Sequence, residues 1–215
     1  MNRCALKLIL AFALLGLTLT ATDATAENVP VFPPGDHPYG HTYPEWAATW
    51  WRWALSQPGG KENPIIDPTG ASCANGQEGN VWFLAGTSGT AVTRSCTVPP
   101  ETALLFPIVN QITCEIRDTH PPKQQTEQLV DGPRCPIAQL ASELSATIDN
   151  FSVSNIGPYC EESVEFEVVL PEHNLFRLPA KTVLDPCSDS GYYLMVRPLL
   201  PGKCCCRTSS TEIEA

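Results

Sequence analysis

The residues best suited to binding in this chain are its tryptophans. Four of the five tryptophans stand between Trp46 and Trp53. At the helical spacing of about 100° per residue, Trp46, Trp50 and Trp53 fall within roughly 60° of one another. Aromatic faces stack on sugar rings or pack against apolar partners. These three residues, together with Asp67, are therefore predicted to bind a glycan or an extracellular protein. The helix is either the lid of a core or half lid and half binding face, and a core helix is the favoured interpretation of the tryptophans themselves.

Acidic residues offer a second chemistry. A pair of carboxylates about 5 Å or 7–9 Å apart would support the hydrolysis of a glycan. Asp67 and Glu78 follow the tryptophan segment and are candidates for such a pair. Because a sequence contains no distances, the catalytic residues stay unassigned.

Two histidines and a carboxylate lie close together before the tryptophans. Asp36, His37 and His41 carry the nitrogen and oxygen ligands that Zn²⁺ or Cu²⁺ accepts. The proline and glycine between the histidines oppose a helix, so their four-residue spacing does not place both rings on one side. His37 and His41 are therefore kept only as candidates for a metal, and no cofactor is predicted.

Sequence motifs of the common enzyme classes are absent. The chain has no H-E-x-x-H zinc motif, no glycine-rich nucleotide loop and no C-x-x-C redox pair. Residues 86–89 miss the G-x-S-x-G nucleophile elbow by one position, and a turn explains them better. The sequence therefore identifies no enzyme class, and an enzyme is the less favoured interpretation.

The N-terminus has the order of a secretory signal peptide. Arg3 and Lys7 precede an apolar run over residues 8–19, and small residues follow up to Ala26. We predict that residues 1–26 are a signal peptide and that the protein is secreted, either extracellular or periplasmic. The apolar run is too short to span a bilayer comfortably, and no second run follows it. No transmembrane segment is therefore expected in the mature chain.

Length and charge set the domain organisation and exclude some partners. Residues 27–203 are predicted to form one secreted domain, because that length suits a single hydrophobic core. Residues 204–215 begin with three consecutive cysteines and are predicted to be an irregular tail. The net charge of −10 at pH 7 argues against nucleic acid as a partner.

The cysteines between the predicted signal peptide and the tail predict disulfides. An exported chain keeps cysteines oxidised, and six of them lie between residues 73 and 187. Nearness in the chain alone favours the pairs Cys73–Cys96, Cys114–Cys135 and Cys160–Cys187, although six cysteines allow fifteen pairings.

Hydrophobic patterning predicts the elements that position these residues. The tryptophan helix is capped by Thr42, has Pro44 in its first turn and ends before residues 56–60. Residues 63–79 predict a long ordered loop held by Cys73, and residues 136–144 predict a second helix. The predicted strands are 81–85 and 91–98 paired as a hairpin, 103–109 with an edge position or a bulge at its proline, 146–148, 151–153, 164–168, and 192–196 after a Ser-Asp-Ser-Gly turn.

Short strands separated by proline- and glycine-rich turns are typical of a mainly β protein. We predict an antiparallel β-sandwich with an N-terminal tryptophan-rich helix and one further helix, stapled by disulfides.

Several uncommon segments occur in a fixed order. They are the tryptophan cluster, VWFLAG at 81–86, RSC at 94–96 and LFPI at 105–108. In these segments the chain resembles a family of small secreted bacterial proteins that has no assigned activity. The resemblance implies no catalytic residues. Such proteins continue past the Pro-Gly turn at 201–202 into further β-strands, so we expect a shortened end and a missing edge strand here.

Three hypotheses for function follow. The favoured one is a secreted, non-catalytic β-sandwich that binds a ligand or partner through the tryptophan helix and the 63–79 loop. The second is a secreted hydrolase acting on a glycan or a similar polymer. The third is a structural envelope protein with every indole buried. Exposure of the tryptophans separates the first hypothesis from the third.

Overall fold

The structure, a computed structural model, describes residues 30–87, 91–117, 144–149, 151–198 and 206–209. In chain order its elements are η1 (Pro38–Gly40), α1 (Tyr43–Ser56), β1 (Val81–Phe83), β2 (Ala103–Ile116), β3 (Ser145–Ile148), β4 (Phe151–Val153), η3 (Gly157–Tyr159), β5 (Cys160–Glu162), β6 (Phe166–Val169), β7 (Val183–Val196) and β8 (Cys206–Ser209). The protein is therefore mainly β, as predicted. None of the helices in these ranges has the length and apolarity needed to cross a membrane.

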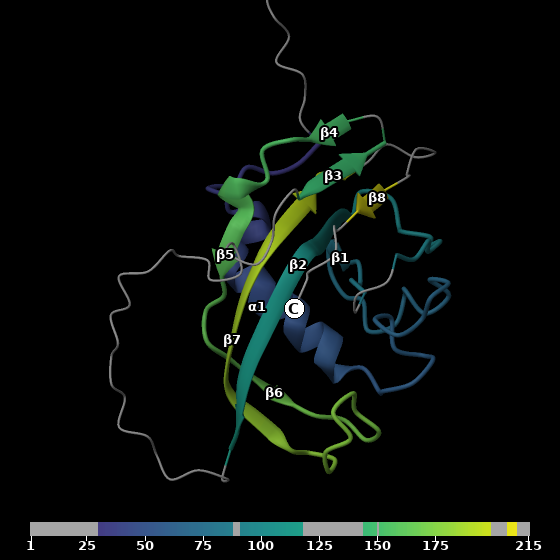
Figure 1. The fold of residues 1–215 in the computed structure, drawn as a ribbon, viewed down its shortest axis with the longest axis vertical. Coiled ribbons are helices and arrows are strands. Elements are labelled where there is room, and N and C mark those ends of the chain that lie inside the picture. The colour runs from purple at the N-terminus through teal and green to yellow at the C-terminus, as the bar shows by residue number, and fades with distance from the viewer. Residues whose placement is uncertain (1–29, 88–90, 118–143, 150, 199–205, 210–215) are drawn as a thin grey trace, which may run out of the picture.

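The two long curled strands β2 and β7 form the centre of the main sheet (Figure 1). β2 and β7 pair antiparallel, from Leu104 opposite Val196 to Ile116 opposite Leu184. β1 pairs parallel with the other side of β2, and β5 and β6 both pair antiparallel with β7. This sheet is mixed and curled, so the predicted antiparallel sandwich is not confirmed.

A second, three-stranded sheet with the order β4-β3-β8 lies at one end of the molecule (Figure 1). Ala146, Ile148 and Val153 of this sheet are buried in the same core as α1, β2 and β7. The pairing of β3 with β4 agrees with the predicted strands at 146–148 and 151–153. β8 was not predicted, because the sequence pattern there is irregular, yet its backbone pairs with β3.

The predicted hairpin between residues 81–85 and 91–98 is wrong. Residues 91–98 form no strand, and β1 instead pairs with β2. The reason lies in the side chains of the second segment. Cys96 is bonded to Cys73, and Arg94 donates to backbone carbonyls of the preceding loop, so the segment is held against the 63–79 loop.

Two of the other strands follow their sequence patterns. The apolar 103–109 segment forms the first half of β2, and the register shifts between Pro107 and Val109, as the proline predicts. In β6 the glutamates at 165 and 167 are exposed while Phe166 and Val168 are buried. The predicted second helix at 136–144 lies almost wholly outside the described residues.

Helix α1 begins where the sequence predicts it. The Thr42 side chain accepts from the amide of Glu45, and the Glu45 carboxylate accepts from the amide of Thr42 at 2.7 Å. This reciprocal capping box satisfies two backbone donors that a helix start otherwise leaves free. α1 lies behind β2 and β7 in Figure 1, and it packs against β5, β6 and β7.

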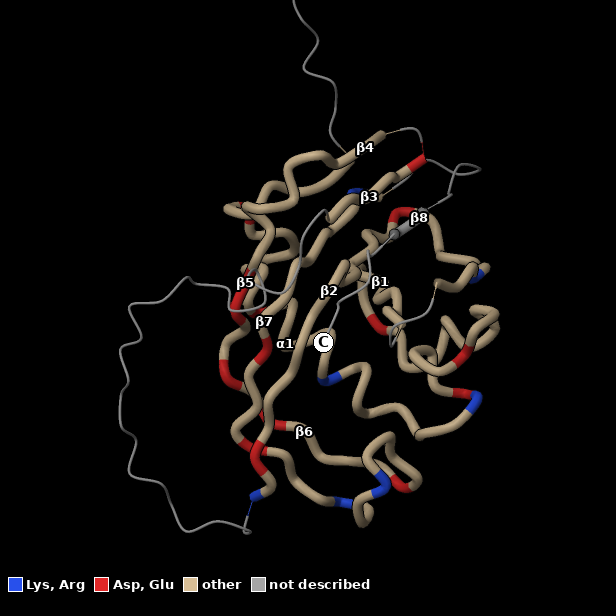
Figure 2. The backbone as a smooth tube through the Cα atoms, in the orientation of Figure 1, with Lys and Arg blue, Asp and Glu red and all other residues tan. Residues whose placement is uncertain are grey.

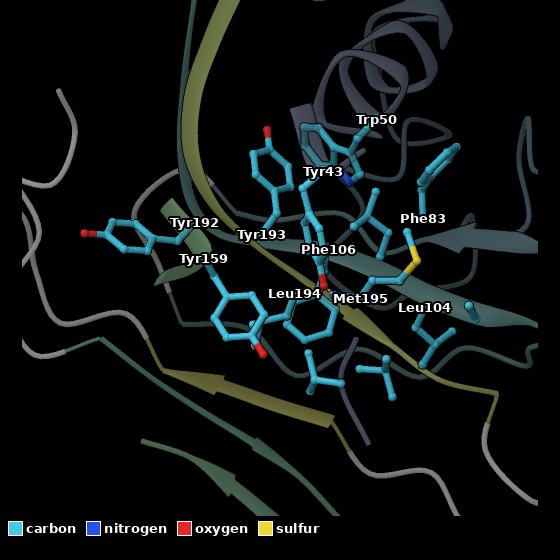
Figure 3. Packing of buried hydrophobic residues seen from close by; sticks show 14 of the residues in the cluster. Tyr43, Trp50, Phe83, Leu104, Phe106, Tyr159, Tyr192, Tyr193, Leu194 and Met195 are labelled. Atoms are coloured by element: carbon cyan, nitrogen blue, oxygen red, sulfur yellow. Dashed lines mark hydrogen bonds between the residues drawn. The ribbon is translucent and has the colours of Figure 1, made fainter. Parts of the chain in front are cut away.

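The indoles of α1 reach out of the helix in several directions, and each N–H finds an acceptor. Trp46 donates to Pro38, Trp50 to Leu84, Trp53 to Asn75 and Trp51 to the Asp189 carboxylate, at 2.5–3.0 Å. Figure 3 shows Tyr43 and Trp50 packed over Phe106, Leu194 and Met195 of the sheet. The helix therefore forms the centre of the core.

One predicted disulfide is confirmed and two are wrong. Cys73 bonds Cys96, as predicted. Cys114 bonds Cys187 across β2 and β7, where the two residues are register partners. The predicted pairs Cys114–Cys135 and Cys160–Cys187 are excluded by that bond. Cys160 is disulfide-bonded as well.

Two conservative substitutions should distinguish an indole whose N–H group is hydrogen-bonded from one whose N–H group has no acceptor. Trp50 is 2% exposed and donates to a backbone carbonyl, so Trp50→Phe leaves a cavity and an unpaired acceptor. We expect it to lower the free energy of unfolding by about 2–3 kcal/mol. The buried Nε1 of Trp82 has no acceptor among the described residues, so Trp82→Phe should change it by less than about 1 kcal/mol.

Urea denaturation followed by circular dichroism measures both variants. Equal losses for Trp50→Phe and Trp82→Phe would contradict the assignment of Trp50 to a hydrogen-bonded core position.

Candidate functional site

Of the three tryptophans predicted to bind a ligand, two belong to the core and the third packs against it. Trp50 and Trp53 are 2% and 5% exposed, and their rings pack on each other and on Phe83. Trp46 is partly buried, with its ring edge-on to His41 at 5.2 Å. No open aromatic face is formed by Trp50 and Trp53, so the structure directs attention to other surfaces.

Asp67 organises the 63–79 loop from within. It is buried and accepts hydrogen bonds from the Thr69 amide, the Thr69 hydroxyl and the Ser72 amide at 2.6–2.8 Å. The Thr69 hydroxyl bond, followed by the two amide bonds, lowers the pKa of Asp67 to about 2. Both carboxylate oxygens are engaged, which does not favour a catalytic pairing with the exposed Glu78.

Arg94 is a structural residue that sequence reasoning did not identify. Its guanidinium donates to the carbonyl oxygens of Ile65, Asp67, Ala85 and Gly86 at 2.6–2.9 Å. One side chain thus fixes the loop after α1 to the chain after β1. The sequence signal is an arginine two residues before a disulfide cysteine, but nothing in it names the acceptors.

The candidate metal ligands do not gather into a metal site. Among the described residues, no group of three or more His, Cys, Asp or Glu side chains is arranged to hold a metal ion. The His41 ring is mostly exposed, and its Nδ1 lies 3.8 Å from the Glu45 carboxylate, near the start of α1. His37 and His41 therefore belong to the surface of the N-terminal arm.

A buried carboxyl group lies where the sequence predicts a turn. Asp189 is 2% exposed in the middle of β7 and accepts from Trp51 Nε1 at 2.5 Å and from the Tyr193 hydroxyl at 2.8 Å. Asn110 in β2 donates in turn to that hydroxyl. Burial raises the pKa of Asp189 to about 7, although both hydrogen bonds oppose the shift. The predicted turn at the Ser-Asp-Ser-Gly segment is therefore wrong, and the segment is part of strand β7. Its aspartate can lie inside the protein because it finds hydrogen-bond donors there.

Asp189 does not form a catalytic site in this structure. A general acid must reach its substrate within hydrogen-bond distance, whereas this carboxyl group is closed off and already paired. Its role is to accept the hydrogen bond of the Trp51 indole N–H, which connects α1 to β7.

A surface depression with room for a ligand, lined by described residues, lies beyond the C-terminal end of α1. We call it the groove. Its volume is about 540 Å³, and it is lined by Gly59, Gly60, Ile66, His173, Asn174, Leu175, Arg177 and Leu178. Ligand sites of proteins fall in this size range. Ile66 belongs to the 63–79 loop that the sequence nominated, whereas the residues from 173 to 178 carry no sequence motif.

One buried asparagine builds the wall of the groove. Asn174 is 3% exposed, and its side chain donates to the carbonyls of Pro171 and Leu178 and accepts from the Leu178 amide. These three bonds close residues 171–178 into a compact loop. The backbone at His173 and Arg177 has positive φ, at 54° and 57°. Such values are uncommon outside glycine, so this loop holds its conformation against a local cost.

The opposite wall requires a glycine. The Gly59 amide donates to the carbonyl of His173, and a Cβ on Gly59 would lie 2.5 Å from that oxygen. Only a residue without a side chain allows the two loops to meet this closely. The two walls of the groove are therefore held together by a backbone contact.

Charges are unevenly spread around the molecule. Figure 2 shows acidic positions in a row along β5 and the adjoining part of β7, and basic positions in the loops that follow α1 and β6. Those loops include Arg177 and His173 of the groove. No aspartate or glutamate lines the groove.

Comparisons of this chain with protein-family models, with curated proteins and with solved structures gave no match. Function is therefore argued below from the geometry alone.

The stability of the protein should depend on pH through Asp189. The unfolded carboxyl ionises near pH 3.8 and the folded one near pH 7. Between these values the folded state binds a proton that the unfolded state lacks, so this group's stabilisation is lost as pH rises from about 4 to about 7. Relative to wild type, Asp189→Asn should gain roughly 3–4 kcal/mol over that interval.

Urea unfolding at pH 4, 5.5, 7 and 8 measures this difference. Glu78→Gln is the control, because it removes the charge of an exposed carboxylate and should follow wild type throughout. A constant offset between Asp189→Asn and wild type would show that Asp189 ionises alike in the folded and unfolded states.

Proposed function

We propose that this chain is an exported, non-catalytic binding protein and that the groove is its ligand site. The observation that carries the proposal is that the groove is preformed. Its walls are held by contacts within the chain itself, namely the Asn174 hydrogen bonds and the Gly59–His173 contact. A site organised in advance avoids the ordering cost of binding.

The disulfides support the exported part of the proposal. Cys73–Cys96 holds the 63–79 loop, and Cys114–Cys187 joins the two central strands. Disulfides of this structural kind persist in oxidising compartments and are rare in the cytosol. The predicted signal peptide at residues 1–26 lies outside the described residues, so it remains a prediction.

A hydrolase is less well supported. A glycan hydrolase of the usual kind needs two carboxyl groups facing one cleft, and no carboxyl group lines the groove. Asp67 is held by its own loop, and Asp189 is closed off from solvent.

The third hypothesis, a structural envelope protein, explains the buried indoles equally well. It gives no reason for a groove whose rim is held in an uncommon backbone conformation.

A fragment screen tests the proposed site. Amide spectra of the full exported chain should shift on adding a small-molecule fragment library, and the shifts should cluster at Gly59, Gly60, Ile66, Leu175 and Leu178. Gly59→Ala should weaken these hits at least several-fold, because its methyl group would push the 171–178 loop away.

Gly35→Ala is the matched control. A Cβ at Gly35 meets nothing within 4 Å, so the same hits should persist in that variant. Hits that cluster elsewhere, or that survive Gly59→Ala unchanged, would contradict the groove as the binding site. A complete lack of hits in a folded protein would favour the structural hypothesis.

A further inference from the structure

We infer that the groove takes a small organic anion, a carboxylate or a phosphate ester attached to a compact apolar body. The inference rests on the proposed function, since it names the class of ligand for the same site. It is argued from the cations that the fold leaves unpaired, from the backbone that presents them and from the apolar residues between them.

Most cations of the described chain have a structural task. Arg52 lies over the Phe166 ring, Arg94 donates to carbonyls, Arg117 pairs with two carboxylates, and Arg197 lies near Asp36 and over Phe32. Among the cationic side chains that the structure describes, Lys61, Arg177 and Lys181 make no such contact with another described residue. Arg177 lines the groove, and Lys61 directly follows Gly60. In a chain of net charge −10, carboxylates to pair with Arg177 are plentiful, yet none lines the groove.

The acids closest in sequence do not line the groove. Glu62 and Glu172 are exposed neighbours of Lys61 and His173, and neither is a lining residue. The lining therefore offers a guanidinium and an imidazole to a ligand, with no competing carboxylate. A guanidinium presents paired N–H donors that match the two oxygens of a carboxylate or a phosphate.

The backbone presents both Arg177 and His173 in a left-handed conformation. His173 and Arg177 have φ values of 54° and 57° and stand on either side of the buried Asn174. Asn174 closes the loop between them, so the two residues are fixed by one hydrogen-bonded turn. Strained backbone of this kind clusters at ligand-binding positions.

Beside Asn174 and the two glycines, the lining has three aliphatic side chains. Leu175 and Leu178 are partly buried, and Ile66 is 48% exposed, which is unusual for isoleucine. A ligand with an apolar body would cover these side chains while its anionic end meets Arg177. The lining holds no tryptophan, tyrosine or phenylalanine, so a neutral sugar would have no ring to stack on.

Three aromatic anions and one neutral analogue serve as probes. Phenylacetate, phenyl phosphate and benzenesulfonate each carry an apolar ring and an anionic group, and phenylacetamide has the shape of phenylacetate without its charge. Titration of the full exported chain, followed by amide shifts of Gly59, Gly60 and Leu175, gives their dissociation constants. We expect at least one anion to bind at least tenfold more tightly than phenylacetamide.

Matched variants test the role of the arginine. Arg177→Gln should weaken binding of the anion about tenfold, and Arg177→Lys, which keeps the charge but loses the fork, should weaken it less. Lys181→Gln is the control, because this substitution also removes one positive charge. Lys181 is exposed and has a positive φ, as Arg177 does, but it does not line the groove. The control substitution should change the affinity by less than twofold. The melting temperature of each variant confirms folding.

The outcomes separate the inference from the proposal beneath it. If phenylacetamide binds in the groove as tightly as the anions, the groove is a ligand site and the anion inference is wrong. If Arg177→Gln and Lys181→Gln weaken the anion equally, only the overall charge matters and the inference is wrong again. If none of the probes and no fragment shifts the groove residues, both the inference and the proposed function fail.

Discussion

The fold depends on finding acceptors for four indole N–H groups on one helix. Burying a tryptophan is favourable only if its donor is satisfied, and α1 must do this four times within eight residues. The acceptors come from four separate parts of the chain: Pro38 in the N-terminal arm, Leu84 after β1, Asn75 in the 63–79 loop and Asp189 in β7. The helix thereby fixes the position of every segment that surrounds it.

This constraint explains two features that look independent. Asp189 stays buried because Trp51 and Tyr193 need its oxygens, even though burial raises its pKa to about 7. The 63–79 loop is ordered without being helix or strand, because Trp53 holds it at Asn75 and Asp67 holds it from within. Burying the carboxyl groups of Asp67 and Asp189 costs free energy, and hydrogen-bond donors within the protein offset that cost.

Local signals in the sequence predict α1 well and the sheet poorly. Thr42, Pro44 and Glu45 fix the start of the helix through neighbours in the chain, so the helix can be predicted. The parallel pairing of β1 with β2 and the Cys114–Cys187 bond join residues whose closeness arises only in the folded sheet. A rule based on nearness in the chain therefore succeeded for Cys73–Cys96 and failed for the other pairs.

The groove could be predicted only in part, for a related physical reason. Ile66 lies in the loop that follows the tryptophans, which the sequence marks by its prolines and glycines. Arg177 and Asn174 lie in a stretch with no motif, and they matter because Gly59 lets the two loops touch. Gly59 allows this contact because it has no side chain, and the sequence does not indicate which segment of backbone will approach it. The site is thus a property of the contact between the loops, which the helix makes possible by holding the 63–79 loop in place.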